Sequence, residues 1–356
     1  MAHGKYEKKP VKKSGRKGSL WLKILIVVLA IVLVLMVAAA VGINYVLGKL
    51  GRFDDLEPSG TGDTTPITDE FDTDSTIDGQ ETIQTIDASD VSLSEVDALE
   101  GENVINVMLI GQDRRPGEDR SRSDTMILVS LNTEKNSVQL TSFMRDTYVQ
   151  IPGYLDNRLN VAYRYGGTEL MNETFRVNFG LDIDGNVMVD FTEFATIIDM
   201  LGGVDLELSS EEIGYMHNAG FTNLSVGENH LTGEEALTFV RMRYVSGGDY
   251  GRTERQRRVL TSLADSFRGA SFATIWSLVE EVLPHVVTNL SDSQILNYVT
   301  TGVSLMAGGA EIQSMRIPAD DAHYGAMIDG MSVLVPDLEM CREDLADFIY
   351  SSDTAE

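Results

Sequence analysis

The sequence is poor in the residues that build disulfides, zinc clusters and histidine-based active sites. One cysteine, Cys341, among 356 residues excludes an internal disulfide framework and a cysteine-rich zinc site. The five histidines are dispersed, and neither HExxH nor GxSxG nor a P-loop occurs. We therefore expect no catalytic role for histidine.

Positive charge is also scarce. The chain has 28 Lys and Arg against 55 Asp and Glu, for a net charge of −27. A strongly acidic protein repels nucleic acid, so no nucleic-acid partner is expected. Any polyanion that this chain binds must be held by a local basic site.

Lysine is almost absent after residue 50, where Lys135 is accompanied by eighteen arginines. Residues 1–23 hold seven lysines and one arginine, so codon bias does not explain the difference. Guanidinium binds phosphate oxygens through a planar fork and stays charged when partly buried. Scattered arginines such as Arg268 and Arg342 are expected in surface ion pairs, whereas clustered ones indicate an anion site.

The N-terminal part predicts a membrane anchor. Residues 24–47 carry no charge, and 24 helical residues would extend roughly 36 Å, enough to cross a bilayer. A cleaved signal peptide is the alternative, but its apolar core would be about 7–15 residues long. The basic flank at 1–23 predicts a cytoplasmic N-terminus and an extracellular remainder of a bacterial single-pass protein.

Residues 48–102 are predicted to form a disordered, acidic, extracellular linker. Residues 52–102 hold sixteen Asp or Glu and one basic residue, Arg52, among many Thr, Ser, Gly and Pro. Such a composition buries too little apolar surface to offset the entropy of ordering.

Residues 103–350 have the texture of a globular domain, followed by a short tail at 351–356. Apolar runs at 103–111, 124–132 and 137–144 predict strands, and the stretch 187–204 passes from a strand into a helix. Thr232-x-x-Glu235 and Thr253-x-x-Gln256 resemble capping boxes that open helices. Mixed strands and helices predict an α/β fold, a three-layer α-β-α sandwich with a central mixed sheet.

Two arginine clusters are candidates for binding an anion. In GQDRRPGEDRSRSDT (111–125), Asp113 and Asp124 fall at neighbouring strand ends beside several arginines, an arrangement that suits Mg²⁺ and a phosphate. A lattice of Asp–Arg salt bridges without metal is the alternative. In RMRYVSGGDYGRTERQRR (241–258), Arg252 and Gln256 would share one face at the start of a helix, where anions are favoured.

The order of short motifs resembles that of the LytR-CpsA-Psr family of bacterial envelope proteins, over about residues 103–350. The motifs are GxDxR (111–115), RSDT (122–125), RDT (145–147), NxAY (160–163), LGGV (201–204), LxGxEAL followed by RxR (231–243), and GDYGRxxRQ (248–256). The resemblance implies a membrane-anchored phosphotransferase. Such an enzyme moves a glycopolymer, of the teichoic acid or capsular polysaccharide type, from a polyprenyl-pyrophosphate carrier to peptidoglycan.

The resemblance also implies a Mg²⁺ cofactor, or Mn²⁺ in its place, and roles for individual residues. Metal ligands would be Asp113 and Asp124. Pyrophosphate ligands would be Arg115, Arg122, Arg145, Arg241, Arg243, Arg252 and Gln256. Residues implied in catalysis are Asp113, Asp124, Arg145, Asp146 and Arg243, and the general base is left open among the three aspartates. The lipid tail would lie in an apolar slot between sheet and helices.

Two other functions fit the same residues. A lipid pyrophosphate pyrophosphatase would use the same arginine cage with water as the acceptor. A lipid-binding or regulatory protein would use it without turnover.

Overall fold

The computed structural model describes residues 51–52, 84–93, 96–99, 101, 103–112, 123–243, 245 and 247–351. The chain divides into two units, Met1–Gly48 and Lys49–Glu356, and every described residue belongs to the second. The predicted tail at 1–23 and the predicted span at 24–47 lie outside the described residues. Within the described part, no helix is both long and apolar enough to span a bilayer.

A seven-stranded mixed sheet forms the centre of the second unit, in the order β1-β11-β8-β3-β4-β5-β12. β3 runs antiparallel to β4 and parallel to β8, while β12 runs parallel to β5. The strands of this sheet are β1 Gly51–Arg52, β3 Val104–Gln112, β4 Ser123–Asn132, β5 Ser137–Phe143, β8 Gly185–Asp190, β11 Val287–Thr288 and β12 Glu311–Ile317. The three strands predicted at 103–111, 124–132 and 137–144 are thus confirmed to within one residue, as is the central mixed sheet.

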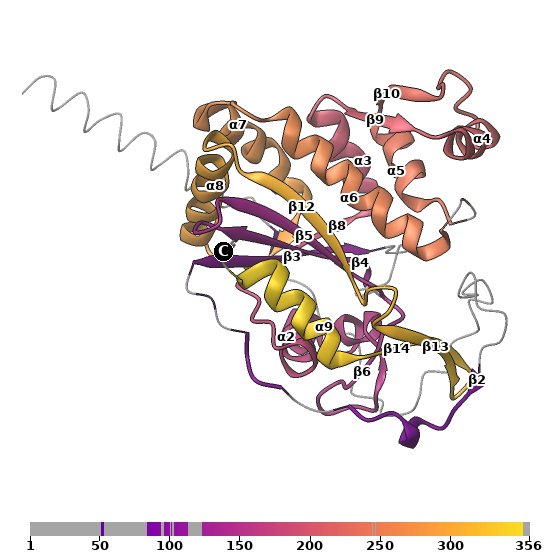
Figure 1. The fold of residues 1–356 in the computed structure, drawn as a ribbon. Helices are drawn as coiled ribbons and strands as arrows, with labels where there is room; N and C mark the ends of the chain where they lie inside the picture. The colour runs from indigo at the N-terminus through magenta and orange to yellow at the C-terminus, as the bar shows by residue number, and fades with distance from the viewer. Residues whose placement is uncertain are drawn as a thin grey trace, which may run out of the picture. The chain divides into compact units, whose positions relative to one another are not determined.

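The helices lie on both sides of this sheet (Figure 1). Their bounds are α2 Asn160–Phe179, α3 Phe191–Met200, α4 Ser210–Asn218, α5 Gly233–Arg241, α6 Gly248–Ser266, α7 Phe272–Val282, α8 Asp292–Ala307 and α9 Leu338–Leu345. There are also short 3₁₀ helices, η2 Ala88–Asp90 and η3 Leu283–His285, and a π-helix, η4 Ala346–Tyr350. One sheet face packs against α2 and α9, and the other meets α3, α6 and α8.

The face toward α2 and α9 holds the largest core. Met108 and Leu128 from the sheet meet Phe175 and Phe179 of α2, and all four are fully buried. Along β3 and β4, Met108 and Leu128 are adjacent to Leu109 and Ile127, which face the other way and line a pocket. This alternation follows the two-residue period of a strand. The two faces of the sheet therefore carry different apolar residues of the same strands.

Smaller sheets flank the central one. An antiparallel pair of strands, β9 Val204–Leu208 and β10 Gly227–Leu231, packs with α3, α4, α5 and α6 around a second core. Another sheet has the order β14-β13-β2, and a short pair joins two more strands. These strands are β2 Gln84–Thr85, β6 Tyr148–Val149, β7 Asn157–Arg158, β13 His323–Ile328 and β14 Met331–Pro336.

The predicted disordered linker is wrong at its C-terminal end. β2 pairs in parallel with β13, and Ile86 and Val91 pack against the core beneath that sheet. Farther on, the Leu99 N–H donates to the Gly180 carbonyl at 2.7 Å. Apolar residues recur among the acidic ones of this segment, and burying them offsets the entropy of ordering. The folded part of the unit therefore reaches back to residue 84.

Candidate functional site

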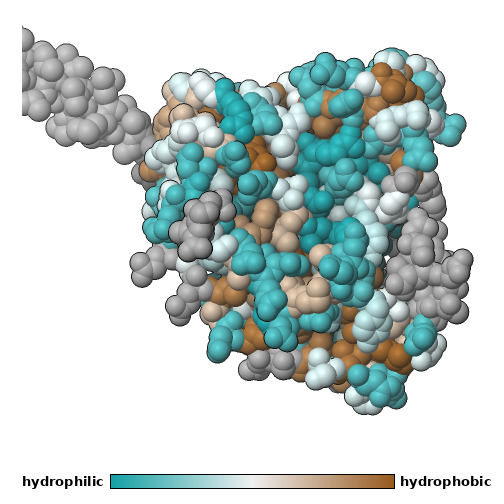
Figure 2. All heavy atoms as spheres, in the orientation of Figure 1, coloured by the Kyte–Doolittle hydropathy of each residue, from teal (hydrophilic) through white to brown (hydrophobic). Residues whose placement is uncertain are grey.

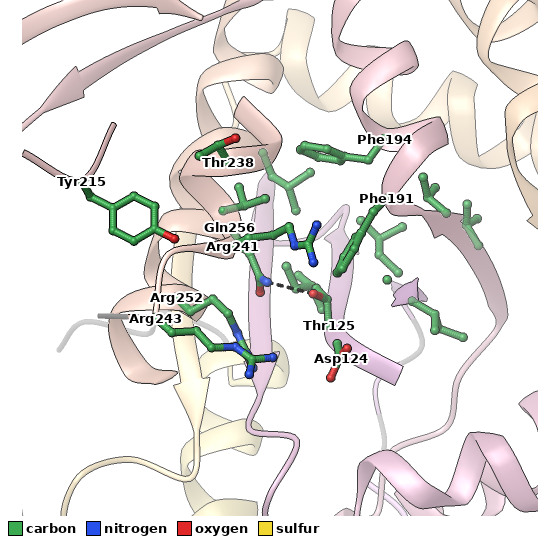
Figure 3. A pocket seen from close by; sticks show the side chains of 18 residues that line it. Asp124, Thr125, Phe191, Phe194, Tyr215, Thr238, Arg241, Arg243, Arg252 and Gln256 are labelled. Carbon is green, nitrogen blue, oxygen red and sulfur yellow. Dashed lines mark hydrogen bonds between the residues drawn. The ribbon is translucent and has the colours of Figure 1, made fainter. Parts of the chain in front are cut away.

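A pocket of about 580 Å³ lies between the central sheet and the helices opposite α2 (Figure 3). Its lining comes from β3, β4 and β8 on the sheet side, and from α3, α4, α5 and α6 on the helix side. The pocket thus lies between sheet and helices, where the apolar slot was predicted. Its two ends differ in chemistry.

The polar end of the pocket gathers Asp124, Arg243 and Arg252 (Figure 3). Asp124 lies at the start of β4, Arg243 follows the end of α5, and Arg252 lies in the second turn of α6. Arg252 is 4% exposed, and its Nε is buried without a hydrogen-bond partner. A buried donor without a partner is costly, so this end of the pocket suits a ligand with acceptor oxygens.

Beside the pocket, the buried guanidinium of Arg145 contacts three carboxylates. Its Nη1 lies 2.7 Å from Asp124 Oδ1, and its Nε lies 3.5 Å from Asp146 Oδ2 and 3.8 Å from Asp249 Oδ2. Asp249 Oδ2 also accepts a hydrogen bond from Arg252 Nη2 at 2.9 Å. Arg145 and Arg252, about a hundred residues apart in the sequence, are thereby linked through one carboxylate.

The network shifts the pKa of its members in different directions. Burial alone would lower the pKa of Arg145, but the carboxylates of Asp146, Asp249 and Asp124 outweigh it and raise that pKa. Burial lowers the pKa of Arg252, and the charges of Arg145 and Arg243 add to this effect. Burial raises the pKa of Asp146 despite Arg145 and Arg158. Arg252 is thus repelled by two neighbouring cations, and an anion placed beside it would relieve that repulsion.

Helix α6 begins earlier than the sequence predicted. Its N-cap is Gly247, in the left-handed region at φ 90°, and its first residue is Gly248. The predicted capping box at Thr253 is therefore wrong, because that hydroxyl lies inside the helix and donates to the Tyr250 carbonyl at 2.9 Å. Glycine reaches the left-handed conformation without the penalty that a Cβ would bring. The earlier start places Arg252 in the second turn of the helix.

Gln256, one turn after Arg252, joins α6 to the sheet. Its Nε2 donates to Thr125 Oγ1 at 2.8 Å (Figure 3). Thr125 pairs with Gly111 across the β3–β4 ladder, and a Cβ on residue 111 would lie 2.8 Å from Thr125 Cβ. Gly111 of the GxDxR motif therefore leaves the room that Thr125 needs to meet Gln256.

The other end of the pocket is apolar. Leu109, Ile127, Val187 and Val189 line it from the sheet, and Phe191, Phe194 and Leu260 line it from the helices. Arg241 lies between the two ends, with its Cζ 4.7 Å from the ring centroid of Phe191 (Figure 3). A ligand with an anionic head and a hydrocarbon tail would match both ends at once.

The structure brings together the predicted site residues that it describes. Asp124, Arg241, Arg243, Arg252 and Gln256 line the pocket, while Arg145 and Asp146 lie against it through the ion network. In Figure 3 the Arg241 side chain lies beside Phe191, apart from those of Arg243 and Arg252. The predicted residues Asp113, Arg115 and Arg122 lie outside the described residues.

Sequence reasoning missed two members of the network, Asp249 and Arg158. Arg158 Nη1 lies 3.4 Å from Asp146 Oδ1. Asp249 stands inside the GDYGRxxRQ motif, three residues before Arg252, and that spacing was the available signal. No comparable pattern marked Arg158, whose contact depends on the short β6–β7 pair.

For a metal ion, the structure offers hard oxygen ligands at the polar end. The side chains of Asp124 and Asp249 are 21% and 26% exposed, and both contact Arg145. Among the described residues, no cluster of three or more metal-binding side chains occurs. This donor set suits Mg²⁺, which takes one or two carboxylates and completes its shell with waters and phosphate oxygens. The alternative predicted from the sequence was an Asp–Arg salt bridge without metal, and such a bridge joins Asp124 to Arg145.

The chain is similar in sequence to known proteins. The model of the LytR_cpsA_psr family matches residues 69–345. A polyisoprenyl-teichoic acid–peptidoglycan teichoic acid transferase, TagU of Bacillus cereus, is 33% identical over 221 residues, 61% of this chain and 69% of that protein. The regulatory protein MsrR of Staphylococcus aureus is 31% identical over 241 residues, 66% of this chain and 71% of that protein.

A solved structure shows a similar fold. It is described as TagT bound to LIIa-WTA, has 25% sequence identity and a TM-score of 0.57, and covers 73% of this chain and 99% of the other.

Proposed function

Because this chain belongs to the LytR_cpsA_psr family, we propose that it is a membrane-anchored phosphotransferase acting on an anionic glycopolymer. It would move a polymer of the teichoic acid or capsular polysaccharide type from a polyprenyl-pyrophosphate carrier to peptidoglycan. The name of the relative TagU supports the donor and acceptor classes. The description of the TagT structure as bound to LIIa-WTA supports a glycopolymer-linked ligand.

The single observation that carries the proposal is the two-ended pocket. Its apolar end, with Val187, Phe191 and Leu260, suits a polyprenyl tail, and its polar end, with Arg243 and Arg252, suits a pyrophosphate. Phosphoryl transfer requires positioning and charge neutralisation more than a protein nucleophile. A cage of guanidinium groups at the end of a lipid slot supplies both.

Each residue of the polar end has a defined task in this mechanism. Arg243 and Arg252 hold phosphate oxygens, and Arg145 fixes the carboxylate of Asp124 at 2.7 Å. Asp249 holds Arg252 in place through its own carboxylate. Asp124 lines the pocket and Asp146 does not, so Asp124 is the better placed of these two to accept the proton of an acceptor hydroxyl.

Asp124, together with Asp113 as predicted from the sequence, would hold Mg²⁺. The ion would neutralise charge on the pyrophosphate and stabilise the leaving group. The predicted span at 24–47 would anchor the chain, with the folded unit outside the cell. Protease added to intact spheroplasts should then cut after about residue 50 and leave the tail intact.

Transfer is tested by incubating the full chain with lipid-linked polymer, Mg²⁺ and peptidoglycan. Polymer covalently attached to glycan is the expected product. Free polymer phosphate with no attachment would indicate a pyrophosphatase and contradict the proposal. Tight lipid binding without either product would indicate a binding or regulatory protein.

A further inference from the structure

A second hollow, an open groove of about 1190 Å³, lies on the side of α6 away from the pocket. Arg252, Gln256 and Leu260 line the pocket at helical spacing, whereas Glu254, Arg257, Arg258, Thr261 and Asp265 line the groove. Residues two or five positions apart point to different sides of a helix. On the face drawn in Figure 2, hydrophilic residues gather over α6 and the neighbouring β9.

Arg257 differs from the other two arginines of this groove. Arg258 Nη1 pairs with Glu212 at 2.6 Å, and Arg255 Nη2 donates to the Met242 carbonyl at 2.6 Å. Arg257 makes no hydrogen bond or ion pair with the described residues, and its Nε and Nη1 are buried without partners. Because a buried donor without a partner is costly, an acceptor group from a ligand would stabilise it.

A second cation lies near Arg257. Burial and the charge of Arg316 lower the pKa of Arg257 to about 10, against the opposing charge of Glu254. Arg316 is itself engaged, because its guanidinium contacts Asp320 and stacks 4.1 Å from the ring centroid of Tyr250. Ser314, two residues before Arg316 on the same side of β12, also lines the groove. This corner of the groove is therefore set up for an anionic group.

The remainder of the groove is acidic. Its acidic wall consists of exposed carboxylates from β9, α4 and α6, namely Asp205, Glu207, Glu211, Glu254 and Asp265. A polymer with a phosphate in every repeat would meet repulsion along this wall. A ligand that combines a carboxylate with a nearby ammonium group matches both the Arg257 corner and the acidic wall, and short peptides with free termini or charged side chains have this combination.

We propose that this groove binds the peptide part of the peptidoglycan acceptor, with a peptide carboxylate on Arg257 and a peptide amine on the acidic wall. This inference rests on the proposed function, since it assumes peptidoglycan as the acceptor. The groove and the pocket border opposite sides of the same helix, α6. A glycan whose peptide lies in the groove would therefore have its hydroxyl groups held near the pyrophosphate.

The test measures direct binding, without any donor lipid. The probe is the set of peptides that an amidase releases from purified peptidoglycan, titrated onto the full chain in detergent. We expect Arg257→Gln to weaken binding at least about tenfold, the scale of a lost charged hydrogen bond. Amidation of the peptide carboxylates should weaken binding to the unchanged protein to a similar extent. Arg342→Gln, which replaces an arginine of α9 that donates to the Asn178 carbonyl and does not line the groove, should leave the affinity unchanged.

Stability and kinetics separate this role from a structural one. Arg257 forms no bond that its replacement would break, so Arg257→Gln should keep or raise the melting temperature. In the transfer assay it should raise the KM for peptidoglycan and leave the KM for the lipid donor unchanged. Equal affinity of Arg257→Gln and the unchanged protein for the peptides, or no binding to either, would overturn the proposal. Because binding is measured without transfer, failure of the transferase assay alone would contradict the proposed function and not this site.

Discussion

The two faces of the central sheet use the same strands in opposite ways. Toward α2, Phe143 packs edge to face on Phe175 with ring centroids 4.7 Å apart, and lies 5.3 Å from Phe179. Toward α3, α5 and α6, the residues that alternate with this core line a pocket of about 580 Å³. The face toward α2 is packed as protein interiors are. The face toward α3, α5 and α6 leaves an open space, which is of use only to a protein that binds a ligand there.

Stability and binding are therefore divided between alternate residues of one strand. On β4, Leu128 is fully buried in the core beneath α2, while its neighbour Ile127 lines the pocket. A sheet with a packed face can hold an open one in place, because the packed face supplies the burial on which folding depends.

Leu128→Ala and Ile127→Ala should separate the two faces most clearly. Leu128→Ala removes packed core atoms and should lower the free energy of unfolding by about 2–5 kcal/mol. Ile127→Ala enlarges an existing space, so it should cost less stability and instead raise the KM for the lipid donor. Denaturant unfolding measures the free energy of unfolding of the two variants, and transfer kinetics measure their KM for the lipid donor. Equal destabilisation by the two variants would contradict the division between faces.

Arg243→Lys tests whether the open face requires guanidinium or only positive charge. Lysine keeps the charge but loses the planar fork, which should cost about 1.5–3 kcal/mol and lower transfer about ten- to a hundredfold. The melting temperature should change little, since Arg243 lies at the pocket. Arg268→Lys, at a surface pair, is the matched control. If both variants transfer equally well, the bidentate role of Arg243 is refuted.

Asp124→Asn tests the predicted metal ligand with little change of shape. It should raise the Mg²⁺ concentration needed for half-maximal transfer by about tenfold, because it removes the charge that would hold the ion. Asp265→Asn, which alters an exposed carboxylate paired with Arg268, should not change that concentration. An unaltered Mg²⁺ requirement in Asp124→Asn would contradict the role of Asp124 as a metal ligand.

The smallest effect expected is a pH dependence from Asp146. Its pKa is raised by burial, so the folded protein binds this proton more tightly than the unfolded chain does. The resulting penalty on stability is absent below the ordinary aspartate pKa and grows as pH rises through the raised value. The difference in unfolding free energy between the protein and Asp146→Asn should therefore vary with pH in the acidic range. A difference that stays constant across that range would argue against the shift.

Much of the fold and part of the site could be predicted from the sequence. The apolar runs beginning at residues 103, 124 and 137 predicted three strands of the central sheet, because a short run rich in Val, Ile and Leu is a local signal. The start of α6 could not be predicted in the same way. Thr253 and Gln256 fit a capping box, but Gly247 in the left-handed region begins the helix earlier. The spacing of a motif cannot show which of two acceptable caps the backbone uses.

Composition, periodicity and motif order were enough to predict the class of the fold and the family. Only the tertiary structure decided which arginines share a space. Arg145 and Arg252 meet at Asp249, Arg241 turns aside to Phe191, and Arg257 faces a separate groove. The physical reason is that charge and burial act through distance in space, which chain spacing does not reveal for residues on different elements.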